Sequence, residues 1–542
     1  MKRSIPLTAV LCAALLLSVA RGRAQDLYVG SNAANVTTNF TSGTNRFNNT
    51  YVGYTTNATN NLLNVSGAGT VLTNTNDLIV GNVGSGNRLV ISNGGQVFNR
   101  SAYLGYGVYT AMPWLYATNN SALVTGTNSR WTVSGLEVGY QGNASSLVIS
   151  NGGQVSSYQP VRIGPYASGN SVLVSGAGSS LLASVQIGEA SIDGLSYNNS
   201  LVVSNGGVIT GTNAVGGGSK IGWSSSNNNV LITGNGSVWT ESGLLSIGLF
   251  EDGISNRLVI SNGGTVTTGG GVIGVGGYTN DPPLPGNAGN SVRVTGTNSL
   301  WTSTGQLVVG QNSDGNSLTI SDGGSVVCGT NLIINQYYPN TNGNYAGSLV
   351  QIDGGRLVVT NGRITFGAGL GTLQVDGGTV EVKELLATTP ITPSGQILPA
   401  ERRGSYVLLN GGTIISGATT ISNGNNSSDD STFYVGGTTG SGAAFIAKGG
   451  THTFWADVTV GRSGSSNSLV ITNGAEVFLK SRPIPSSEQS RGGTNFVIGV
   501  AAGAANNSVS ISSGRLVMTN GTLEIGRAGS GTLSIHGGTV EA

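Results

Sequence analysis

The phrase Leu-Val-Ile-Ser-Asn-Gly-Gly stands at three places in the chain, Leu89–Gly95, Leu147–Gly153 and Leu258–Gly264. Near copies begin at Leu201, with Val-Val-Ser, and at Leu469, with Val-Ile-Thr-Asn-Gly. Such repetition is typical of stacked copies of one small unit, each of which buries its apolar face against its neighbours. The repeat therefore decides the architecture before any functional site is considered.

Each copy continues with a second apolar stretch and then a third of the form apolar-x-apolar-Gly, as in Val161–Gly164 and Leu245–Gly248. A second version of the unit has Ser-Gly-Ala-Gly at its first turn, as in Asn170–Leu181. Alternate side chains of a strand face opposite ways, so the charged Arg162 marks the outward side of the third strand. Three short strands per copy, Gly-rich turns and no helical periodicity predict an all-β parallel β-helix (β-solenoid).

The residue that enters the first turn of each copy gives the spacing of the coils. Ser, Thr, Asp and Asn dominate this position, and we expect their side chains to bond nearby backbone N–H groups while Gly supplies positive φ. Stacking the marked coils at about 4.8 Å per rung predicts a rod roughly 80 Å long. These turn-entry residues are Ser66, Ser92, Thr125, Ser150, Ser175, Ser204, Thr233, Ser261, Thr295, Ser321, Asp353, Asp376, Asn410, Lys448, Thr472, Ser512 and His536.

Residues 1–24 have the pattern of a secretory signal peptide. A basic start precedes the apolar stretch Leu7–Val19, and Gly22–Ala24 is a small-residue cleavage site. A cut after Ala20 is an alternative, as is a membrane anchor, although the apolar stretch is short for a membrane span. We therefore expect an exported protein, secreted or displayed at a bacterial cell surface or outer membrane.

The remaining chain divides into a regular repeat array at 25–345 and a less regular one at 346–542, which ends in mid-pattern. We expect the second array to be truncated at its C-terminus or to lack its own anchor. Removal of the leader lowers the basic count from 24 to 20, against 23 acidic residues. No basic patch predicts nucleic-acid binding, and Cys328 alone cannot form an intrachain disulfide.

At this level of detail the repeats resemble a known bacterial family. The phrases Ser-Leu-Val-Ile-Ser-Asn-Gly-Gly and apolar-x-Ile-Gly, preceded by Asn-Ser, are similar to the repeats shared by autotransporter passenger domains and PEP-CTERM-associated exported proteins. The resemblance covers residues 60–330 well and 340–542 more loosely. It implies an exported, surface-displayed or released β-helical rod, and the family has no catalytic motif to transfer. The family's C-terminal β-barrel and its Pro-Glu-Pro sorting tail are not found in this sequence, so an outer-membrane barrel or sorting partner encoded elsewhere is one expectation.

Residues suited to catalysis are sparse. Glycan-cleaving chemistry needs two carboxylates, or carboxylates with a metal and a basic residue, close in space. Asp353 and Asp376 share a turn position in neighbouring coils, but they are more simply interpreted as turn-capping residues. The histidines His452 and His536 belong to different coils and lack ligand spacing. We predict no catalytic residues, no metal site and no cofactor.

Aromatic residues are the one pattern that exceeds background. They recur in the loop that follows the third strand, and equivalent loops of a solenoid stack on one edge, which predicts an aromatic stripe. The stripe either binds an extended ligand such as a glycan, by ring stacking, or packs on itself and on the turns for stability. The candidate ligand-binding residues are Tyr106, Trp114, Tyr140, Tyr166, Trp223, Tyr278 and Tyr337, and Tyr54, Tyr197 and Phe250 extend the row.

Tryptophan also recurs at Trp131, Trp239 and Trp301, five residues after the turn glycine. Leu72 and Leu181 occupy the same position in other copies, which favours a core role over ligand stacking. The sequence as a whole therefore predicts a structural or adhesin-like rod without catalytic activity, with cell-surface or matrix polysaccharide as its candidate partner. The alternative is a carbohydrate-binding or carbohydrate-active β-helix protein of the lyase or hydrolase type.

Overall fold

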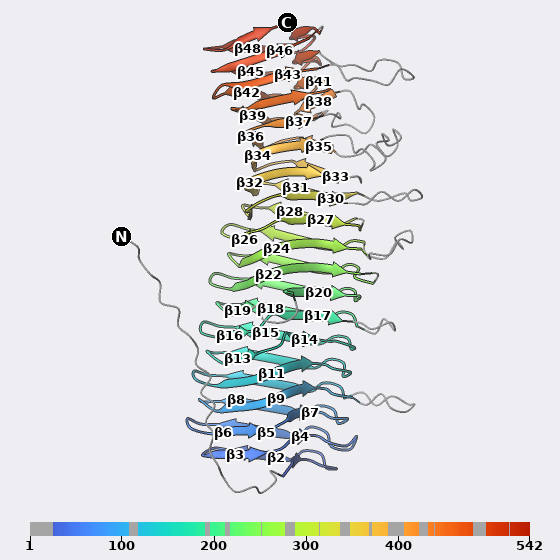
Figure 1. Ribbon diagram of the computed structural model, residues 1–542, viewed down its shortest axis with the longest axis vertical. Coiled ribbons are helices and arrows are strands. Elements are labelled where there is room, and N and C mark those ends of the chain that lie inside the picture. Colours follow the sequence, from blue (N-terminus) through green and yellow to red (C-terminus); the bar gives the residue numbers. More distant parts are fainter. Residues whose placement is uncertain are drawn as a thin grey trace, which may run out of the picture.

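The structure is a computed structural model that describes residues 25–107, 117–189, 196–211, 217–250, 252–276, 288–313, 315–336, 347–367, 371–387, 406–421, 432–437, 439–480, 495–519 and 521–542. The expected signal peptide at 1–24 lies outside these residues. The described chain forms a single tall stack of rungs with the strands running across it (Figure 1). No helix within the described ranges has the length and apolar character that crossing a membrane requires.

Each coil has three faces, and every ladder between the named strands is parallel. The strands of the first face pair only with one another, in the order in which the chain visits them. They are β2 (Thr37–Phe40), β5 (Leu62–Ser66), β8 (Arg88–Ser92), β10 (Ser121–Thr125), β12 (Ser146–Ser150), β15 (Ser171–Ser175), β18 (Ser200–Ser204), β21 (Asn229–Thr233), β23 (Arg257–Ser261), β25 (Ser291–Thr295), β28 (Ser317–Ser321), β31 (Ser348–Asp353), β33 (Gly371–Val375), β35 (Tyr406–Leu409), β38 (Thr432–Val435), β41 (Asp457–Val460), β44 (Phe496–Ile498) and β47 (Leu523–Ile525).

The second and third faces form a continuous sheet, because in six coils one long strand bends across the corner between them. The bent strands are β9 (Gln96–Leu104), β11 (Arg130–Val138), β22 (Val238–Leu249), β24 (Thr265–Val275), β32 (Arg356–Phe366) and β34 (Thr379–Ala387).

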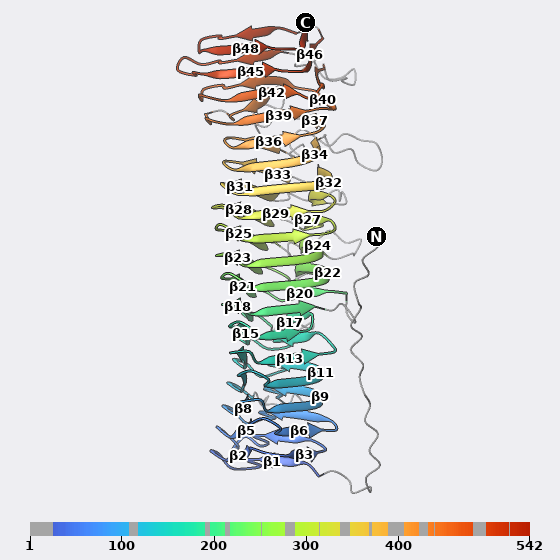
Figure 2. The same ribbon diagram turned by 90° about the vertical axis from the view of Figure 1, so that its left-hand side faces the viewer.

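The other strands of the second face are β3 (Thr44–Phe47), β6 (Val71–Asn74), β13 (Gln154–Ser157), β16 (Ser180–Leu182), β19 (Val208–Gly211), β26 (Leu300–Ser303), β29 (Ser325–Cys328), β36 (Thr413–Ser416), β39 (Ala444–Lys448), β42 (Ser468–Thr472), β45 (Asn507–Ile511) and β48 (Gly531–Ile535). Those of the third face are β1 (Leu27–Val29), β4 (Thr50–Val52), β7 (Asp77–Val80), β14 (Val161–Ile163), β17 (Val185–Glu189), β20 (Ser219–Trp223), β27 (Leu307–Gln311), β30 (Leu332–Gln336), β37 (Thr419–Ile421), β40 (Thr451–Phe454), β43 (Ala475–Leu479), β46 (Gly514–Met518) and β49 (Thr539–Glu541). Turned by a quarter, the same stack shows its rungs one above another along the whole rod (Figure 2).

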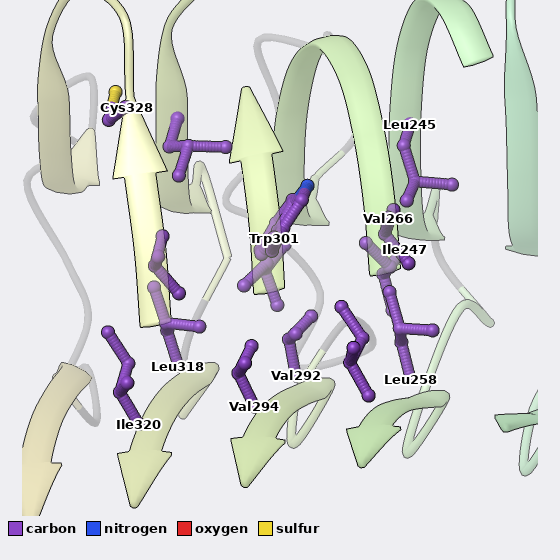
Figure 3. Close-up of a cluster of buried hydrophobic side chains, with 14 of the residues drawn as sticks. Leu245, Ile247, Leu258, Val266, Val292, Val294, Trp301, Leu318, Ile320 and Cys328 are labelled. Carbon is purple, nitrogen blue, oxygen red and sulfur yellow. The ribbon is translucent and has the colours of Figure 1, made fainter. Parts of the chain in front are cut away.

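The interior is one hydrophobic core that runs from Val29 to Met518. Inward side chains alternate with outward ones along each strand, as the period of two requires. Trp301 lies fully buried among Val292 and Val294 of the first face and residues of the other two (Figure 3). Trp131 and Trp239 are buried in the same way, as are Leu72 and Leu181. The predicted core role of this position is confirmed.

Buried asparagines stabilise the corner before the strand that enters the turn of each repeat, which is a first-face strand up to Asn316 and a second-face strand at Asn467 and Asn507. The Oδ1 atom of Asn199 accepts a hydrogen bond from the backbone N–H of Asn170, one rung below, at 2.9 Å. Its own backbone N–H donates to Asn228 Oδ1, one rung above, at 3.0 Å. A side-chain ladder therefore parallels the backbone ladder and satisfies N–H groups inside the rod. Its members are Asn61, Asn87, Asn120, Asn170, Asn199, Asn228, Asn256, Asn290 and Asn316, with Asn467 and Asn507 further on.

In the Ser-Asn-Gly-Gly turn, the residue type at each position has its own physical explanation. Asn93 (φ 52°) and Gly94 (φ 83°) both take the left-handed conformation that a tight turn demands. A Cβ on Gly95 would lie 2.3 Å from the carbonyl oxygen of Val65. The Ser92 hydroxyl donates to the Ser66 hydroxyl one rung away, at 3.0 Å. The turn-entry side chains of this pair therefore bond to each other along the rod, which differs from the backbone bonding that we expected.

The assignment of strand type to face changes at β38. Up to β37 the first face holds the strands that run into the Ser-Asn-Gly-Gly turn. From β38 onward it holds strands of the apolar-x-apolar-Gly form, and β42, a copy of the opening phrase, lies on the second face. The rings of Phe433, Phe445 and Phe454, one from each face of this coil, meet at centroid distances of 5.4–5.8 Å. The last four turn-entry residues therefore lie at a different corner from the rest, within the segment expected to be less regular.

Candidate ligand-binding surface on the third face

The outward positions of the third face form a column in which aromatic and charged residues concentrate. Strand register places Tyr103, Glu137 and Arg162 on consecutive rungs, followed by Gln186 and Lys220. Outward neighbours on adjacent parallel strands lie one strand spacing apart, about 4.8 Å. These side chains from distant parts of the sequence therefore form one continuous strip.

Four tyrosines form what we call the aromatic ridge: Tyr103, Tyr106, Tyr140 and Tyr166. The rings of Tyr106 and Tyr140 are stacked, with centroids 5.2 Å apart and planes at 19°. Tyr103 meets Tyr106 edge-on at 5.0 Å, and Tyr166 meets Tyr140 edge-on at 5.5 Å. All four side chains are partly buried. The ridge crosses three consecutive coils as an ordered aromatic surface.

The glycine that ends the third strand explains why the aromatic residues come together. Gly105 and Gly139 both have positive φ, at 71° and 76°, and each is followed at once by a tyrosine. Gly164 (φ 62°) precedes Tyr166 by two residues. Because the same turn recurs at the same corner on each rung, the residues after it are brought into one row.

An ion cluster lies beside the ridge. Arg162 bonds Glu137 on the rung below, at 2.9 Å, and Glu189, at 2.7 Å. Burial raises the pKa of Glu137, opposed by the attraction of Arg162. The carboxylates hold the pKa of Arg162 above its usual value against the effect of burial. Arg162 also lies 5.7 Å from the centre of the Tyr166 ring, so the guanidinium joins the ion cluster to the ridge.

Two smaller aromatic groups lie further along the rod. Trp223 contacts Phe250 at 6.2 Å, and the ammonium group of Lys220 lies 3.7 Å from the Trp223 ring centre. Burial lowers the pKa of Lys220, with an opposing effect from Glu189. Near the N-terminal end, Tyr54 completes a three-ring cluster with Tyr28 and Tyr51 of β1 and β4, at 5.0–5.2 Å.

Of the predicted site residues, the structure brings Tyr106, Tyr140 and Tyr166 into contact and places Trp223 in a separate pair. Tyr197 is 45% exposed, and no ring contact joins it to the others within the described chain. Trp114, Tyr278 and Tyr337 lie outside the described residues.

Sequence reasoning missed Tyr103 and the carboxylates of Glu137 and Glu189. The signal was present in Arg162, which marked the outward side of its strand. Following that position from copy to copy reaches Glu137 and Tyr103 on the two preceding rungs.

The acids that the sequence singled out do not form a pair among the described contacts. Asp376 accepts hydrogen bonds from the side-chain amides of Gln351, Gln374 and Asn410, at 2.7–2.8 Å. Among the described acidic residues, Glu241 is the most deeply buried, and it accepts bonds from the Ser219 hydroxyl at 2.5 Å and the Gly243 N–H at 3.1 Å. These carboxylates are engaged in holding turns and corners together.

The two histidines have different surroundings. His452 is fully buried, with Nε2 2.7 Å from the carbonyl oxygen of Gly449 and Nδ1 3.1 Å from the Thr419 hydroxyl. A carbonyl only accepts, so Nε2 carries the proton, and burial lowers the pKa of the ring. His536 is exposed at its turn. In the described ranges, no group of three or more His, Cys, Asp or Glu side chains is placed to hold a metal ion.

The fold and the third-face surface define a protein of the parallel β-helix class. No family model matches the chain, and no curated protein matches it. Among solved structures, the chain is similar to a crystal structure of a TibC-catalysed, hyper-glycosylated fragment of TibA. The sequence identity is 14%, the TM-score is 0.33, and the match covers 84% of this chain and 96% of that fragment.

Proposed function

We propose that this protein is an exported β-helical rod with a structural or adhesin-like role, displayed at a bacterial cell surface or in the matrix, and without catalytic activity. The repeat resemblance to autotransporter passenger and PEP-CTERM-associated proteins supports export. An uninterrupted core supports a rigid rod, since each coil is stabilised by its two neighbours. Cell fractionation, with detection of mature chain starting at Gln25, tests the location. Recovery of the full-length chain in the cytoplasm would contradict it.

The observation that carries a binding role is the aromatic ridge. Stacked Tyr106 and Tyr140, with Tyr103 and Tyr166 at their edges, offer ring faces and hydroxyls over three coils. Sugar rings stack on aromatic faces while their hydroxyls bond to neighbouring polar groups. Rungs about 4.8 Å apart would present these groups in a line. An extended cell-surface or matrix polysaccharide is therefore the partner that this surface suits.

Replacing Tyr106, Tyr140 and Tyr166 together by Ser is the test of this role. We expect the triple variant to lose at least tenfold in affinity for purified cell-surface polysaccharide, measured by calorimetry or by retention on immobilised glycan. Tyr158→Ser is the matched control, because that side chain is 68% exposed and its ring is in none of the described ring contacts of the ridge. Equal binding by wild type and triple variant would leave the tyrosines as packing residues only.

The ion cluster favours a second candidate, a carbohydrate-active β-helix. The Oε2 atom of Glu137 is buried with no hydrogen-bond partner in the described part of the chain, and burial raises the pKa of that carboxyl, as a general acid requires. Against this, Glu137 and Glu189 both bond to Arg162, which suits a positioning role better. Incubation with polysaccharide, followed by assays for new reducing ends and unsaturated products, separates the two. Cleavage that Glu137→Gln abolishes would establish the enzyme.

A further inference from the structure

The dipeptide Asn-Gly is prone to spontaneous deamidation, because glycine has no side chain to keep its nitrogen away from the asparagine side chain before it. That nitrogen attacks the side-chain carbon Cγ, so the reaction requires a free glycine N–H and a backbone that can rotate toward the side chain. The structure separates the Asn-Gly positions by the bonds that these groups make. In the described chain the dipeptide begins at Asn93, Asn151, Asn205, Asn235, Asn262, Asn361, Asn410 and Asn473.

In the Ser-Asn-Gly-Gly turns, neighbouring rungs bond both reacting groups. The Gly152 N–H donates to the buried Ser179 hydroxyl on the rung above, at 3.0 Å. The side-chain amide of Asn151 donates to Thr125 Oγ1 on the rung below, at 3.2 Å. The same two bonds recur in three other turns, where Gly94, Gly206 and Gly263 donate to Ser129, Ser237 and Ser299, and Asn93, Asn205 and Asn262 donate to Ser66, Ser175 and Thr233.

Asn235-Gly236 lies in the other version of the turn, whose counterpart has alanine at Ala177. The Ser237 N–H donates to the carbonyl of Gly234 at 3.0 Å, which leaves Asn235 and Gly236 at the exposed tip. Among the described residues, no hydrogen bond is made by the Gly236 N–H or by the side-chain amide of Asn235. The attacking nitrogen and the amide that it attacks are therefore both unrestrained at this turn.

The remaining pairs are restrained in other ways. The Gly411 N–H donates to the carbonyl of Val375 at 3.0 Å, and the Asn410 amide donates to Asp376 Oδ1 at 2.8 Å. The Gly474 N–H donates to the carbonyl of Ser513 at 3.0 Å. Asn361 lies within the extended strand β32, whose backbone directs the next nitrogen away from the side chain.

We propose that Asn235 is a site of non-enzymatic deamidation, a modification that the folded rod suppresses at the other described Asn-Gly pairs. The Gly236 nitrogen bonds to Cγ of Asn235, the Cγ–Nδ2 bond breaks, and the departing nitrogen takes up the glycine proton and leaves as ammonia. Water then opens the succinimide at either carbonyl, which gives aspartate or isoaspartate. Each event adds one negative charge to a corner where the turn residues of the adjacent rungs, Asn205 and Asn262, are uncharged.

The purified mature chain is incubated at pH 8 and about 37 °C, and its peptides are followed over weeks by mass spectrometry for the gain of about 1 Da. We expect Asn235 to react at least tenfold faster than Asn205 and Asn262, its counterparts on the rungs below and above. In urea-unfolded chain the three rates should agree within about threefold, because the protecting bonds are lost on unfolding. Equal rates in the folded rod, or an equal spread in urea, overturn the proposal.

Three variants test the protecting bond. Asn235→Ala removes the modification and fits the turn, since Ala177 occupies the equivalent position. Ser179→Ala removes the acceptor of the Gly152 N–H, so Asn151 should react at least threefold faster while Asn235 is unchanged. Ser179→Thr is the matched control, because it keeps the hydroxyl and Thr70 occupies this position in another coil. An Asn151 rate that is the same in Ser179→Ala, Ser179→Thr and wild type overturns the protecting role of the bond and the proposal with it.

Discussion

The amide side chain of Asn199 occupies the space that a side chain at Gly164 would need. A Cβ built on Gly164 would lie 2.1 Å from Asn199 Oδ1, and Gly164 also has a positive φ of 62°. The glycine of the apolar-x-apolar-Gly phrase therefore packs against the asparagine of the Asn-Ser phrase, and the two residues together form one corner of the coil. The same pairing recurs at Gly30 and Asn61, Gly53 and Asn87, Gly81 and Asn120, Gly139 and Asn170, Gly222 and Asn256, Gly248 and Asn290, Gly436 and Asn467, and Gly461 and Asn507.

The first prediction follows from this contact. Gly164→Ala should destabilise the rod by about 2–4 kcal/mol, from backbone strain and overpacking. Asn199→Ala should cost about 1–3 kcal/mol, because it leaves the buried N–H of Asn170 without an acceptor. In the double variant the new Cβ has room, so its loss should be smaller than the two single losses combined. Urea unfolding of all four proteins measures the coupling, and strict additivity would disprove it.

The second prediction compares two buried tryptophans. Trp131 Nε1 donates to Asn99 Oδ1 at 2.8 Å, whereas Trp239 Nε1 has no hydrogen-bond partner among the described residues. Leucine occupies this position in other coils, so Trp131→Leu and Trp239→Leu should both fold. We expect Trp131→Leu to be the more destabilising by about 1 kcal/mol, the usual net value of one hydrogen bond. The difference between their urea midpoints is the measurement, and a larger loss for Trp239→Leu would refute the assignment.

The third prediction concerns the ion cluster. Arg162→Gln leaves Glu137, whose side chain is only 17% exposed, without its cation, so the variant should lose about 1–3 kcal/mol at pH 8. The loss should shrink toward pH 4, because a carboxyl whose folded pKa is raised favours folding in its protonated form. Adding Glu137→Gln to Arg162→Gln should restore part of the stability at pH 8. Urea midpoints at the two pH values decide the matter; a loss independent of pH would point to packing instead of charge.

The fourth prediction is a pH dependence that comes from His452. Burial holds its pKa below the ordinary 6.5, so the unfolded chain takes up the proton first. The corresponding stability is fully present above pH 6.5 and is lost as the pH falls below it. His452→Gln should flatten the stability profile between pH 7.5 and 5, while His536→Gln, at an exposed turn, should leave it unchanged. Identical slopes in wild type and His452→Gln would contradict the prediction.

Most of the local structure could be predicted from the sequence, because it depends on near neighbours. The alternation around Arg162 predicted the strand correctly, and the Ser-Asn-Gly-Gly phrase predicted the turn. The exchange of Trp for Leu predicted the core position. The predicted rod needs only that equivalent residues stack. The partners of the turn-entry hydroxyls were not predictable from one copy, because Ser92 bonds a residue 26 positions away.

The third-face surface was predictable only in part. The recurrence of aromatic residues after the third strand placed Tyr106, Tyr140 and Tyr166 in one row. It did not indicate that Tyr103 would join them, since that residue lies on the strand and not in the loop. Whether adjacent rows touch depends on the register between coils, which loops of different length leave open in the sequence.

By itself, the sequence determined that this chain is a three-sided parallel stack, because one period repeated along the chain admits a single way of burying each apolar stretch. Only the tertiary structure decided which face each stretch occupies. The exchange of faces at β38 is the example, since the phrase beginning at Leu469 reads like the one at Leu147 yet lies around a different corner. The physical reason is that backbone hydrogen bonds join each coil to its neighbours. These bonds fix the register between paired strands, but they do not depend on which phrase of the repeat forms the strand.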